Sequence, residues 1–444
     1  MNDVKNIAFY TLGCKLNYSE SDTIARSFDR KSFKRVPFGH PADIYVINTC
    51  SVTHIADSKC RNAIKRAKRQ NPDAFVIATG CYTQLNNDAV SCMEDIDLVV
   101  DANQKLDIAK IYRQRQKSKE KPVNGKAVIN RIRSCDGFKP AFSLDERTRS
   151  FLKIQDGCDY FCTYCTIPMA RGVSRSATIE DIVKTSVYLA GQGVHEVVLS
   201  GVNVGEFGVR NGESLSELLC ELIKVKGIDR YRISSIEPNL LTSGIIKMVA
   251  DSGKLARHFH IPMQSGSDEI LKLMRRKYVT AFYRAKIEEI HEKVPGACIG
   301  ADVITGFPGE TDIHFRETYE FIEQLKLSYL HVFPYSERPN TGAVKSPAKV
   351  PVPVRRKRAD ALRALSERMK KDFYSSQKGS RGIVLFESSL KAGSMFGFTD
   401  NYVKVKIPAS AALINHMVEV DLIDLEEDGT MRANLVNRDY SEQL

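Results

Sequence analysis

Three cysteines stand within eight residues near the middle of the chain, in the stretch DGCDYFCTYCTIP. Cys158, Cys162 and Cys165 are spaced C-x3-C-x2-C, so three thiolates lie on one short loop. Three thiolates can ligate three corners of an iron–sulfur cube and leave the fourth iron open to a cosubstrate. The ring of Tyr164, just before the last cysteine, can stack on an adenine beside such a cluster. The spacing therefore indicates an iron–sulfur site with one open iron.

A zinc knuckle and scattered core cysteines are the alternatives for this loop. Zinc sites usually pair cysteines as C-x2-C, with a second pair or histidines later in the chain. No such partner follows the loop, and this favours iron–sulfur over zinc.

A second group of cysteines follows three apolar, strand-like runs in the first 115 residues. Helical stretches such as 56–69 lie between the runs, and this alternation predicts a mostly parallel sheet with right-handed crossovers. Because the carboxyl ends of parallel strands share one edge, we expect the three cysteines to converge there. The runs and their cysteines are 7–12 with Cys14, 44–48 with Cys50, and 75–79 with Cys81.

Three thiolates at one edge make a second three-cysteine site, for which ordinary buried cysteines are the alternative. A single cysteine would favour that alternative, but a strand followed by cysteine occurs three times. Cys60 and Cys92 lack this placement, and we interpret them as structural. The sequence therefore predicts two separate three-cysteine sites.

Strands and helices also alternate over about residues 146 to 375. Six strand–helix units predict a barrel or part of one, with its chemistry on the loops after the strands. Those loops are polar or glycine-rich, and they read SGVNVGEFG, SSIEPN, PMQSGSD, TGFPGET and PYSERP. The expected strands are 151–155, 196–200, 231–234, 259–262, 299–304 and 329–333, and the expected helices are 179–190, 215–225, 244–250, 281–294 and 315–325.

Short apolar runs separated by turn residues fill the end of the chain and predict a small β-barrel. The stretch 354–369, just before it, predicts a basic helix. We expect Ala361, Leu362 and Leu365 to pack while the cations project and contact phosphate, with a solvated helix face as the alternative. The expected strands are 383–386, 395–399, 402–407 and 417–422, and the cations are Arg355, Arg356, Lys357 and Arg358.

The composition is that of a globular protein with a basic net charge. Its 444 residues suggest two to four domains, and 43% of them are hydrophobic. The net charge of +11 suggests a polyanionic partner such as nucleic acid. The sequence contains no run of about eighteen apolar residues and no signal-peptide pattern, so we expect a cytoplasmic protein whose cysteines stay reduced.

Two further patterns only resemble binding motifs. The run 191–193, Gly-Gln-Gly, follows a predicted helix rather than a strand, so we expect it to end that helix. His258 and His260 share one strand face and can ligate metal, although such a pair more often belongs to a packed or hydrogen-bonded barrel wall.

With these motifs in view, the chain resembles the radical S-adenosylmethionine (SAM) methylthiotransferases. TLGCKLNYSESD, NTCSVT and TGCYTQ resemble the N-terminal domain of that family, and the loop order resembles a partial (β/α)6 radical SAM barrel. The tail resembles a TRAM domain, an RNA-binding module. The implied α/β architecture is an N-terminal parallel-sheet domain at 1–115, a linker at 116–145, a radical SAM domain at 146–375 and a TRAM barrel at 376–444.

The resemblance also implies which residues bind the cofactors. The loop cysteines would hold a 4Fe–4S cluster whose open iron takes the amino and carboxylate groups of SAM, and the strand-end cysteines would hold an auxiliary 4Fe–4S cluster. The run 201–203 replaces the family's usual Gly-Glu-Glu, which leaves the contact with the SAM amino group partly to backbone carbonyls. Turn-making and helix capping are the alternatives for these loops. The implied SAM contacts are Tyr164, Gly201, Val202, Asn203, Ser235, Glu237, Gln264, Ser265 and Gly266.

The implied reaction is methylthio transfer to C2 of an adenine. That C2–H is not acidic, so a base cannot easily activate it, whereas SAM with an iron–sulfur cluster supplies a radical. Within the family the chain most resembles the branch acting on N6-threonylcarbamoyladenosine beside the anticodon, through the tail stretch MFGFTDNYVKVKIP. Branches acting on isopentenyladenosine in tRNA or on a ribosomal-protein aspartate are alternatives.

The implied partners are the tRNA anticodon stem-loop and an electron donor such as flavodoxin or ferredoxin. We expect a monomer that does not bind a membrane. A non-catalytic RNA-binding metalloprotein is the alternative from a different class, and it predicts a colourless zinc protein.

Overall fold

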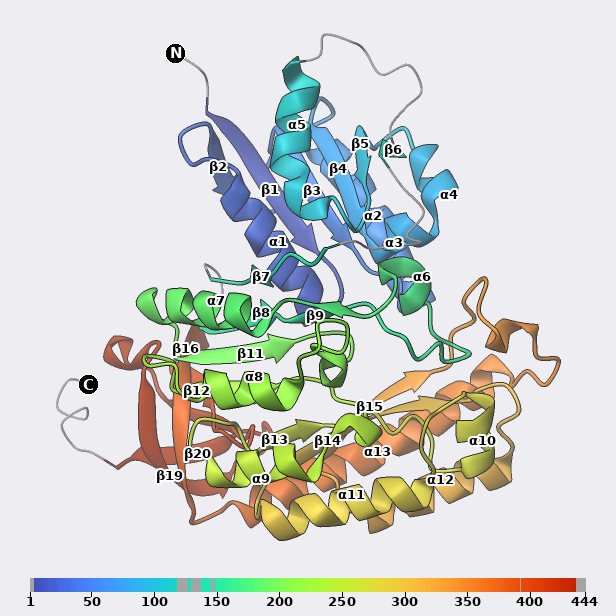
Figure 1. Ribbon diagram of the computed structural model, residues 1–444, viewed down its shortest axis with the longest axis vertical. Helices are drawn as coiled ribbons and strands as arrows, with labels where there is room; N and C mark the ends of the chain where they lie inside the picture. Colours follow the sequence, from blue (N-terminus) through green and yellow to red (C-terminus); the bar gives the residue numbers. More distant parts are fainter. Residues whose placement is uncertain (1–3, 118–126, 129–136, 145–147, 392, 437–444) are drawn as a thin grey trace. The chain divides into compact units, whose positions relative to one another are not determined.

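The computed structural model describes residues 4–117, 127–128, 137–144, 148–391 and 393–436 (Figure 1). Most of the predicted linker at 116–145 lies outside the described residues. The chain forms two compact units, and the cysteine loop contributes residues to both. The first unit contains Met1–Asp145, Phe151–Phe161 and Cys165–Ala177, and the second contains Glu146–Ser150, Cys162–Tyr164 and Thr178–Leu444.

A six-stranded sheet forms the core of the first unit, in the order β2-β1-β3-β4-β5-β6. Every ladder in it is parallel, as the alternation of strands and helices predicted. Its strands are β1 (Lys5–Thr11), β2 (Phe33–Val36), β3 (Ile44–Thr49), β4 (Phe75–Gly80), β5 (Leu98–Val100) and β6 (Ala127–Val128). Its helices are α1 (Lys15–Ser27), α2 (His54–Gln70), α3 (Cys81–Leu85), α4 (Asn87–Ser91) and α5 (Ile108–Lys117).

Apolar runs explain why this sheet forms. All six residues of β3 are buried, as expected for a strand covered on both faces. Helix α2 begins where the Thr53 side chain accepts a hydrogen bond from the Ala56 amide. Its residues Ile64 and Ala67 pack into the core. Two short antiparallel pairs follow along the chain, β7 (Ala141–Phe142) with β8 (Arg149–Lys153) and β9 (Gln155–Asp156) with β10 (Arg175–Ser176), together with α6 (Ile167–Arg171). Strand β8 begins in the second unit and continues into the first.

The second unit contains the predicted strand–helix alternation from residue 179 onward, whereas the first predicted strand, 151–155, lies in the first unit. Strands β11 and β12 pair in parallel, β13, β14 and β15 form a second parallel group, and bridges such as Ser235–His260 join the two groups. The strands are β11 (Glu196–Ser200), β12 (Arg230–Ile233), β13 (His258–His260), β14 (Cys298–Thr305) and β15 (Tyr329–Pro334). The helices are α7 (Ile179–Gly191), α8 (Leu215–Leu222), α9 (Ser243–Asp251), α10 (Asp268–Leu273), α11 (Thr280–Lys293) and α12 (Asp312–Gln324).

A glycine marks the end of one of these helices, as the sequence predicted. Helix α7 ends at Gly191, and Gly193 has a φ of +77°, which confirms the predicted helix stop. Helix α10 was not predicted, because its six residues are too few to show a helical period.

A closed barrel of five strands ends the chain, in the order β16-β17-β18-β20-β19. Its interior is packed with apolar side chains such as Val384, Phe386 and Val405. The small barrel predicted from the short runs is confirmed, and β20 is the strand that the prediction lacked. The strands are β16 (Arg381–Lys391), β17 (Ser394–Phe398), β18 (Lys404–Pro408), β19 (Met417–Leu425) and β20 (Met431–Leu435).

The basic helix is α13 (Val352–Ser376), and its cations do not all project as predicted. Leu362 and Leu365 are buried as expected. Arg355 is also buried, because it donates to the carbonyls of Val350 and Tyr335 at 2.7 and 2.9 Å. That part of the prediction is therefore wrong: a buried arginine that satisfies backbone carbonyls is not available to phosphate.

Arg358 is buried for a similar reason, since it forms ion pairs with Glu310 and Asp312 at 2.6 and 2.7 Å. Arg356 and Lys357 are exposed, and their contact with RNA stays a prediction. Among the described residues, no helix is both long and apolar enough to cross a membrane.

Candidate functional site

The strand-end cysteines gather at one edge of the first unit's sheet. Cys14, Cys50 and Cys81 follow β1, β3 and β4, which are neighbours in that sheet. A Cβ added to Gly13 would lie 2.9 Å from both Cβ and Sγ of Cys50, so the turn before Cys14 lies directly against Cys50. Gly13 has a φ of +107°, which favours glycine. The structure thus brings three thiols together from distant positions, and their role as cluster ligands stays a prediction.

Gly80 positions the third cysteine in the same way. Its φ is +101°, and an added Cβ would lie 2.4 Å from the Thr49 carbonyl oxygen. Only glycine fits this close approach between the ends of β3 and β4. Cys81 then begins helix α3 directly after the strand.

Burial and nearby cations set the electrostatics of these thiols. Burial raises the pKa of Cys50 to about 11. Burial also raises the pKa of Cys81, while the charges of Arg171 and Lys105 act to lower it. Cys14 is the N-cap of α1, where the positive end of the helix favours an anion. The nearby cations Arg171 and Lys105 favour the thiolate form of Cys81, which a cluster ligand must adopt.

Arg171 lies in a fully buried charge network that the sequence did not reveal. Its guanidinium donates to Glu20 at 3.2 Å, to Asp156 at 2.9 Å and to the Asn17 side-chain oxygen at 2.5 Å. Lys153 and Lys105 also pair with Glu20. These cations hold the pKa of Glu20 well below its usual value despite burial. The network ties the end of α6, just beyond the cysteine loop, to α1, just beyond Cys14.

The start of the cysteine loop needs glycine. Gly157 has a φ of +72°, and an added Cβ would lie 2.0 Å from the Val173 carbonyl oxygen. The Cys158 amide donates to the Gly172 carbonyl at 3.2 Å, and the Gln155 side chain donates to the Gly157 carbonyl at 2.8 Å. These bonds fix the backbone from which Cys158 projects.

Cys162, in the second unit, accepts a hydrogen bond from a buried arginine. Arg276 Nη1 lies 3.2 Å from Cys162 Sγ and 3.5 Å from the Tyr164 hydroxyl, and Nη2 pairs with the Glu237 carboxylate. The Arg276 side chain is 2% exposed. Arg276 therefore donates directly to one of the predicted cluster ligands. The basic run Arg275-Arg276-Lys277 was the signal that sequence reasoning missed.

Thr163 fixes this middle segment of the loop within the second unit. Its amide and hydroxyl donate to the carbonyls of Met274 and Leu273 at 3.2 and 2.9 Å. The adjacent Tyr164 ring lies edge-on to Phe307, with centroids 6.3 Å apart. Tyr164 is partly buried, and stacking of an adenine on it stays a prediction.

The predicted SAM contacts follow the ends of strands. Among those at 264–266, one has an unusual backbone conformation and two pack against a helix. Gln264 has a φ of +68°, rare for a residue other than glycine, and its amide donates to the Asp302 carbonyl at 2.8 Å. Strained backbone of this kind is concentrated at functional sites. Ser265 and Gly266 instead pack against α12, because an added Cβ at Gly266 would lie 2.7 Å from the Thr318 Cα.

The remaining predicted contacts lie on two adjacent loops. Gly201, Val202 and Asn203 follow β11, and Ser235 and Glu237 follow β12. The amide of the next residue along the first loop, at position 204, donates to the carbonyl at position 235 at 3.3 Å. The two loops therefore meet beside the Glu237–Arg276 pair.

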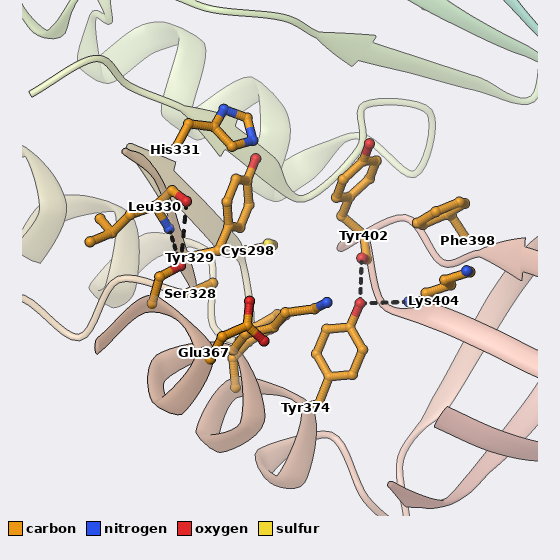
Figure 2. A pocket seen from close by; sticks show the side chains of 13 residues that line it. Cys298, Ser328, Tyr329, Leu330, His331, Glu367, Tyr374, Phe398, Tyr402 and Lys404 are labelled. Atoms are coloured by element: carbon orange, nitrogen blue, oxygen red, sulfur yellow. Dashed lines mark hydrogen bonds between the residues drawn. The ribbon is translucent and has the colours of Figure 1, made fainter. Parts of the chain in front are cut away.

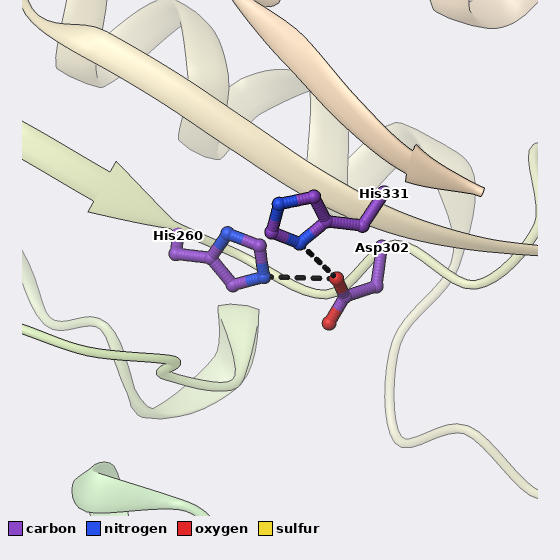
Figure 3. A group of neighbouring side chains, drawn as sticks. All are labelled: His260, Asp302 and His331. Carbon is purple, nitrogen blue, oxygen red and sulfur yellow. Dashed lines mark hydrogen bonds and ion pairs between the residues drawn. The ribbon is translucent and has the colours of Figure 1, made fainter. Parts of the chain in front are cut away.

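His260, Asp302 and His331 form a cluster on the neighbouring strands β13, β14 and β15 (Figure 3). Asp302 Oδ1 lies 3.0 Å from His260 Nε2 and 3.2 Å from His331 Nδ1. His258 Nε2 lies 2.9 Å from the Tyr329 hydroxyl. The two histidines singled out in the sequence are thus hydrogen-bonded parts of the barrel wall, as the more frequent case predicted. Two imidazoles and a carboxylate are also a common metal-ligand set.

Comparisons with known proteins agree with this arrangement. Residues 152–322 match the Radical SAM superfamily, and residues 6–101 match the uncharacterized protein family UPF0004. The chain is 40% identical to the threonylcarbamoyladenosine tRNA methylthiotransferase MtaB of Bacillus subtilis, over 94% of this chain and 93% of that protein. The MtaB of Aquifex aeolicus is also 40% identical, over 90% of this chain and 96% of its own length.

Another relative is named for a different substrate. The tRNA-2-methylthio-N(6)-dimethylallyladenosine synthase of Syntrophus aciditrophicus is 34% identical, over 94% of this chain and 92% of that protein. Among solved structures, the radical SAM methyltransferase TsrM of Kitasatospora setae, with tryptophan and a SAM analog bound, matches with a TM-score of 0.57. It covers 87% of this chain and 79% of its own at 12% identity, so this likeness shows the fold alone.

Proposed function

Because the chain belongs to the radical SAM tRNA methylthiotransferase family, we propose that it transfers a methylthio group to C2 of N6-threonylcarbamoyladenosine next to the anticodon of tRNA. The observation that carries this proposal is the second group of three cysteines. Cys14, Cys50 and Cys81 add to the cysteine loop a separate thiolate set, beside buried cations. Sulfur insertion needs such a second place to hold sulfur, whereas SAM cleavage alone does not.

Membership of the family implies SAM and a 4Fe–4S cluster, and we propose that Cys158, Cys162 and Cys165 hold that cluster. We further propose that the three strand-end cysteines hold a second 4Fe–4S cluster with one open iron. The fixed charges of Arg276 and Arg171 support both assignments, since each lies beside a thiol of one set.

Bound together, a 4Fe–4S cluster and SAM supply the radical chemistry that removes hydrogen from an unactivated C–H bond. The chain's own residues orient the reactants. Arg276 holds Cys162 and Glu237 in fixed positions, and Glu237 then presents a carboxylate oxygen where the SAM ribose is expected. The loops at 201–203 and 264–266 remain our proposed contacts for the amino, carboxylate and sulfonium groups of SAM.

The choice of substrate within the family rests on the relatives. Both relatives at 40% identity are named for threonylcarbamoyladenosine, and the relative named for dimethylallyladenosine is 34% identical. The modified base also carries a carboxylate, which a basic pocket would favour over an apolar prenyl group. Isopentenyladenosine in tRNA is therefore the second candidate substrate.

We also propose the setting in which the enzyme works. A low-potential donor such as flavodoxin or ferredoxin would supply the electron, and the enzyme would act as a cytoplasmic monomer on the anticodon stem-loop. The proposed division is 1–115 for the methylthiotransferase N-terminal domain, 116–145 for a linker, 146–375 for the radical SAM domain and 376–444 for a TRAM domain.

Deletion of the gene, followed by mass spectrometry of tRNA nucleosides, tests the substrate. We expect threonylcarbamoyladenosine to accumulate without its methylthio form, while methylthio-isopentenyladenosine stays unchanged. The reverse pattern would move the chain to the isopentenyl branch. No change in either nucleoside would point to the branch that acts on a ribosomal-protein aspartate. Zinc instead of iron in the purified protein would favour a non-catalytic RNA-binding metalloprotein.

A further inference from the structure

Helix α2 of the first unit is strongly basic. Its sequence, HIADSKCRNAIKRAKRQ, contains six lysines and arginines but one acidic residue, Asp57. Asp57 is buried and accepts a hydrogen bond from the Ser51 hydroxyl at 2.8 Å, so it does not face solvent. The carboxylate of this helix therefore does not offset the cations on its exposed side. Those six residues are Lys59, Arg61, Lys65, Arg66, Lys68 and Arg69.

Most of these cations lie on one side of the helix. Because about 3.6 residues make one turn, positions 59, 62, 65, 66 and 69 fall within about a third of the helix circumference. The opposite side packs into the core of the sheet through residues such as Ile64 and Ala67. We call the exposed side the α2 face, and it consists of Lys59, Asn62, Lys65, Arg66 and Arg69.

Within the described residues, the cations of the α2 face have no carboxylate partner. Arg66 instead lies over the Phe38 ring, 5.5 Å from its centroid, a contact that holds the guanidinium in place and keeps its charge. Other helices differ, because the exposed Lys184, Lys247 and Lys293 each pair with an acid four residues away. A solvated helix face usually mixes both signs in that way, whereas cations alone attract a polyanion.

The α2 face begins close to the strand-end cysteines. Cys50 follows β3 directly, and Thr53 then caps α2. The helix runs back along the sheet, as a crossover between the parallel strands β3 and β4 requires. Lys59 is thus the cation of the face nearest to the cysteines, and Arg69 lies roughly 15 Å farther along at 1.5 Å per residue. Phosphates that follow the face therefore lead toward the cysteine edge.

The end of α2 nearest to the cysteines is apolar instead of charged. Val52 and Ile55 are 55% and 69% exposed, and both lie between Cys50 and Lys59 in the sequence. RNA loops present unstacked bases, whose faces are apolar, while RNA stems present phosphates. An apolar end followed by a row of cations therefore matches the loop and the stem of an RNA hairpin.

A pocket of about 350 Å³ in the second unit offers RNA less than the α2 face does (Figure 2). Its Tyr402 ring already contacts Phe398 and His258, at centroid distances of 4.9 and 4.6 Å. Lys404 lies over the Phe396 ring, 4.6 Å from its centroid. These rings and this lysine contact one another, so a base cannot stack on Tyr402.

We propose that the α2 face binds the phosphate backbone of the tRNA substrate and leads the RNA to the sheet edge with Cys14, Cys50 and Cys81. The inference rests on the proposed action on tRNA. Cations in a row along one helix match phosphates that repeat along one strand. A folded acidic protein, in contrast, presents carboxylates scattered over a broader surface, and this favours RNA as the partner.

The first test measures binding of an anticodon stem-loop RNA to the full-length enzyme with its clusters, at several salt concentrations. Lys65→Ala combined with Arg69→Ala should weaken binding several-fold at every salt concentration. The salt dependence should fall by about one for each phosphate contact that is lost. Alanine suits an exposed helix position, so iron content and circular dichroism should match the wild type.

Arg113→Ala combined with Lys139→Ala is the matched control. It also removes two positive charges from exposed side chains of the first unit, but these cations pair with Asp29 and Asp107 at 3.0 and 2.6 Å. The net charge is the same in both variants, so a difference in RNA binding reports position and not total charge. We expect the control to bind the RNA nearly as tightly as the wild type.

Photo-cross-linking locates the RNA without removing any charge. Asn62 lies among the cations of the α2 face, and Gln114 is an exposed amide on α5. Helices α2 and α5 pack on opposite faces of the same sheet, because they contact alternate residues of β3. Asn62→p-benzoylphenylalanine should cross-link to the stem-loop, and Gln114→p-benzoylphenylalanine should not.

Three outcomes would overturn the proposal, and they differ from one another. Equal binding by the two double variants, or equal cross-linking from both positions, would show that the charge acts generally. Normal RNA binding by the α2 variant, with slower reduction by flavodoxin, would make the face a docking site for an acidic protein. If the wild type does not bind the stem-loop at all, the proposed action on tRNA is itself wrong, and this proposal falls with it.

Discussion

The two cysteine sites are built in opposite ways. Cys14, Cys50 and Cys81 come from the ends of three neighbouring strands, and two of the three thiols are buried. The other set lies on one loop of eight residues, and two of its thiols are partly exposed. The strand-end cysteines lie close together only while the whole sheet is folded. The loop cysteines lie close together because they are close in sequence. The difference suits a protected auxiliary centre in one case and a centre open to SAM in the other.

Each site also has its own arginine. Arg171 lies in a network of ion pairs with Glu20 and Asp156, which two lysines also join. The carboxylates therefore balance the charge of Arg171. Arg276 balances one carboxylate, Glu237, and directs another N–H to Cys162. The first arginine is therefore expected to matter chiefly for stability and the second for the chemistry of the cluster.

Removal of each cysteine set gives the largest effect and separates the roles. Replacing Cys158, Cys162 and Cys165 with Ala should abolish both SAM cleavage and methylthiolation. Replacing the strand-end cysteines with Ala should abolish methylthiolation but leave reductive cleavage of SAM to 5′-deoxyadenosine, measured by chromatography. Cys92→Ser, which changes an exposed cysteine outside both sets, is the control and should leave both activities intact. Loss of SAM cleavage in a folded strand-end variant would contradict the separation.

Arg171→Met should destabilise the protein by about 3–5 kcal/mol, because it removes one of the cations that balance the buried carboxylates of Glu20 and Asp156. Urea unfolding followed by circular dichroism measures this loss. Arg113→Met is the matched control in the same unit, since Arg113 pairs with Asp29 on the surface and its loss should change stability little. Equal losses for the two variants would show that the network does not hold the first unit together.

Much of this comparison was predictable from sequence, and the limits have physical causes. The spacing of the loop cysteines and the strand–cysteine repeats depend on local order, which a sequence displays directly. Arg171 and Arg276 could not be placed, because their partners lie far away in sequence, as Glu20 does from Arg171 and Glu237 from Arg276. The prediction that Arg355 is exposed was wrong for a related reason. The sequence does not distinguish a buried arginine that donates to carbonyls from an exposed one.

Arg276→Gln should slow SAM cleavage by about 10- to 100-fold, since a hydrogen bond to a charged group contributes about 1.5–3 kcal/mol. Loss of the positive charge at Cys162 should also lower the reduction potential of the loop cluster, which electron paramagnetic resonance titration measures. Arg275→Gln is the control, because Arg275 is its exposed neighbour. An unchanged potential would mean that Arg276 acts only on Glu237.

Acid should weaken the first unit through its depressed carboxyls. Favourable cations keep the pKa of Glu20 and of Asp156 well below their usual values, so their stabilisation is complete above about pH 5. Below their ordinary pKa values it falls with pH, by about 1.4 kcal/mol per pH unit for each proton taken up on unfolding. Urea titrations from pH 7 to pH 3 measure the slope, and Glu20→Gln should flatten it. A slope equal in wild type and variant would argue against the network.

Iron and sulfide analysis of anaerobically reconstituted protein tests the central claim, that two separate sites each hold a 4Fe–4S cluster. We expect about eight irons and eight sulfides per wild-type chain, as two cubes require. Alanine at either set of three cysteines should leave about four of each, whichever set is removed. A wild-type value near four irons, or bound zinc in place of iron, would contradict the account.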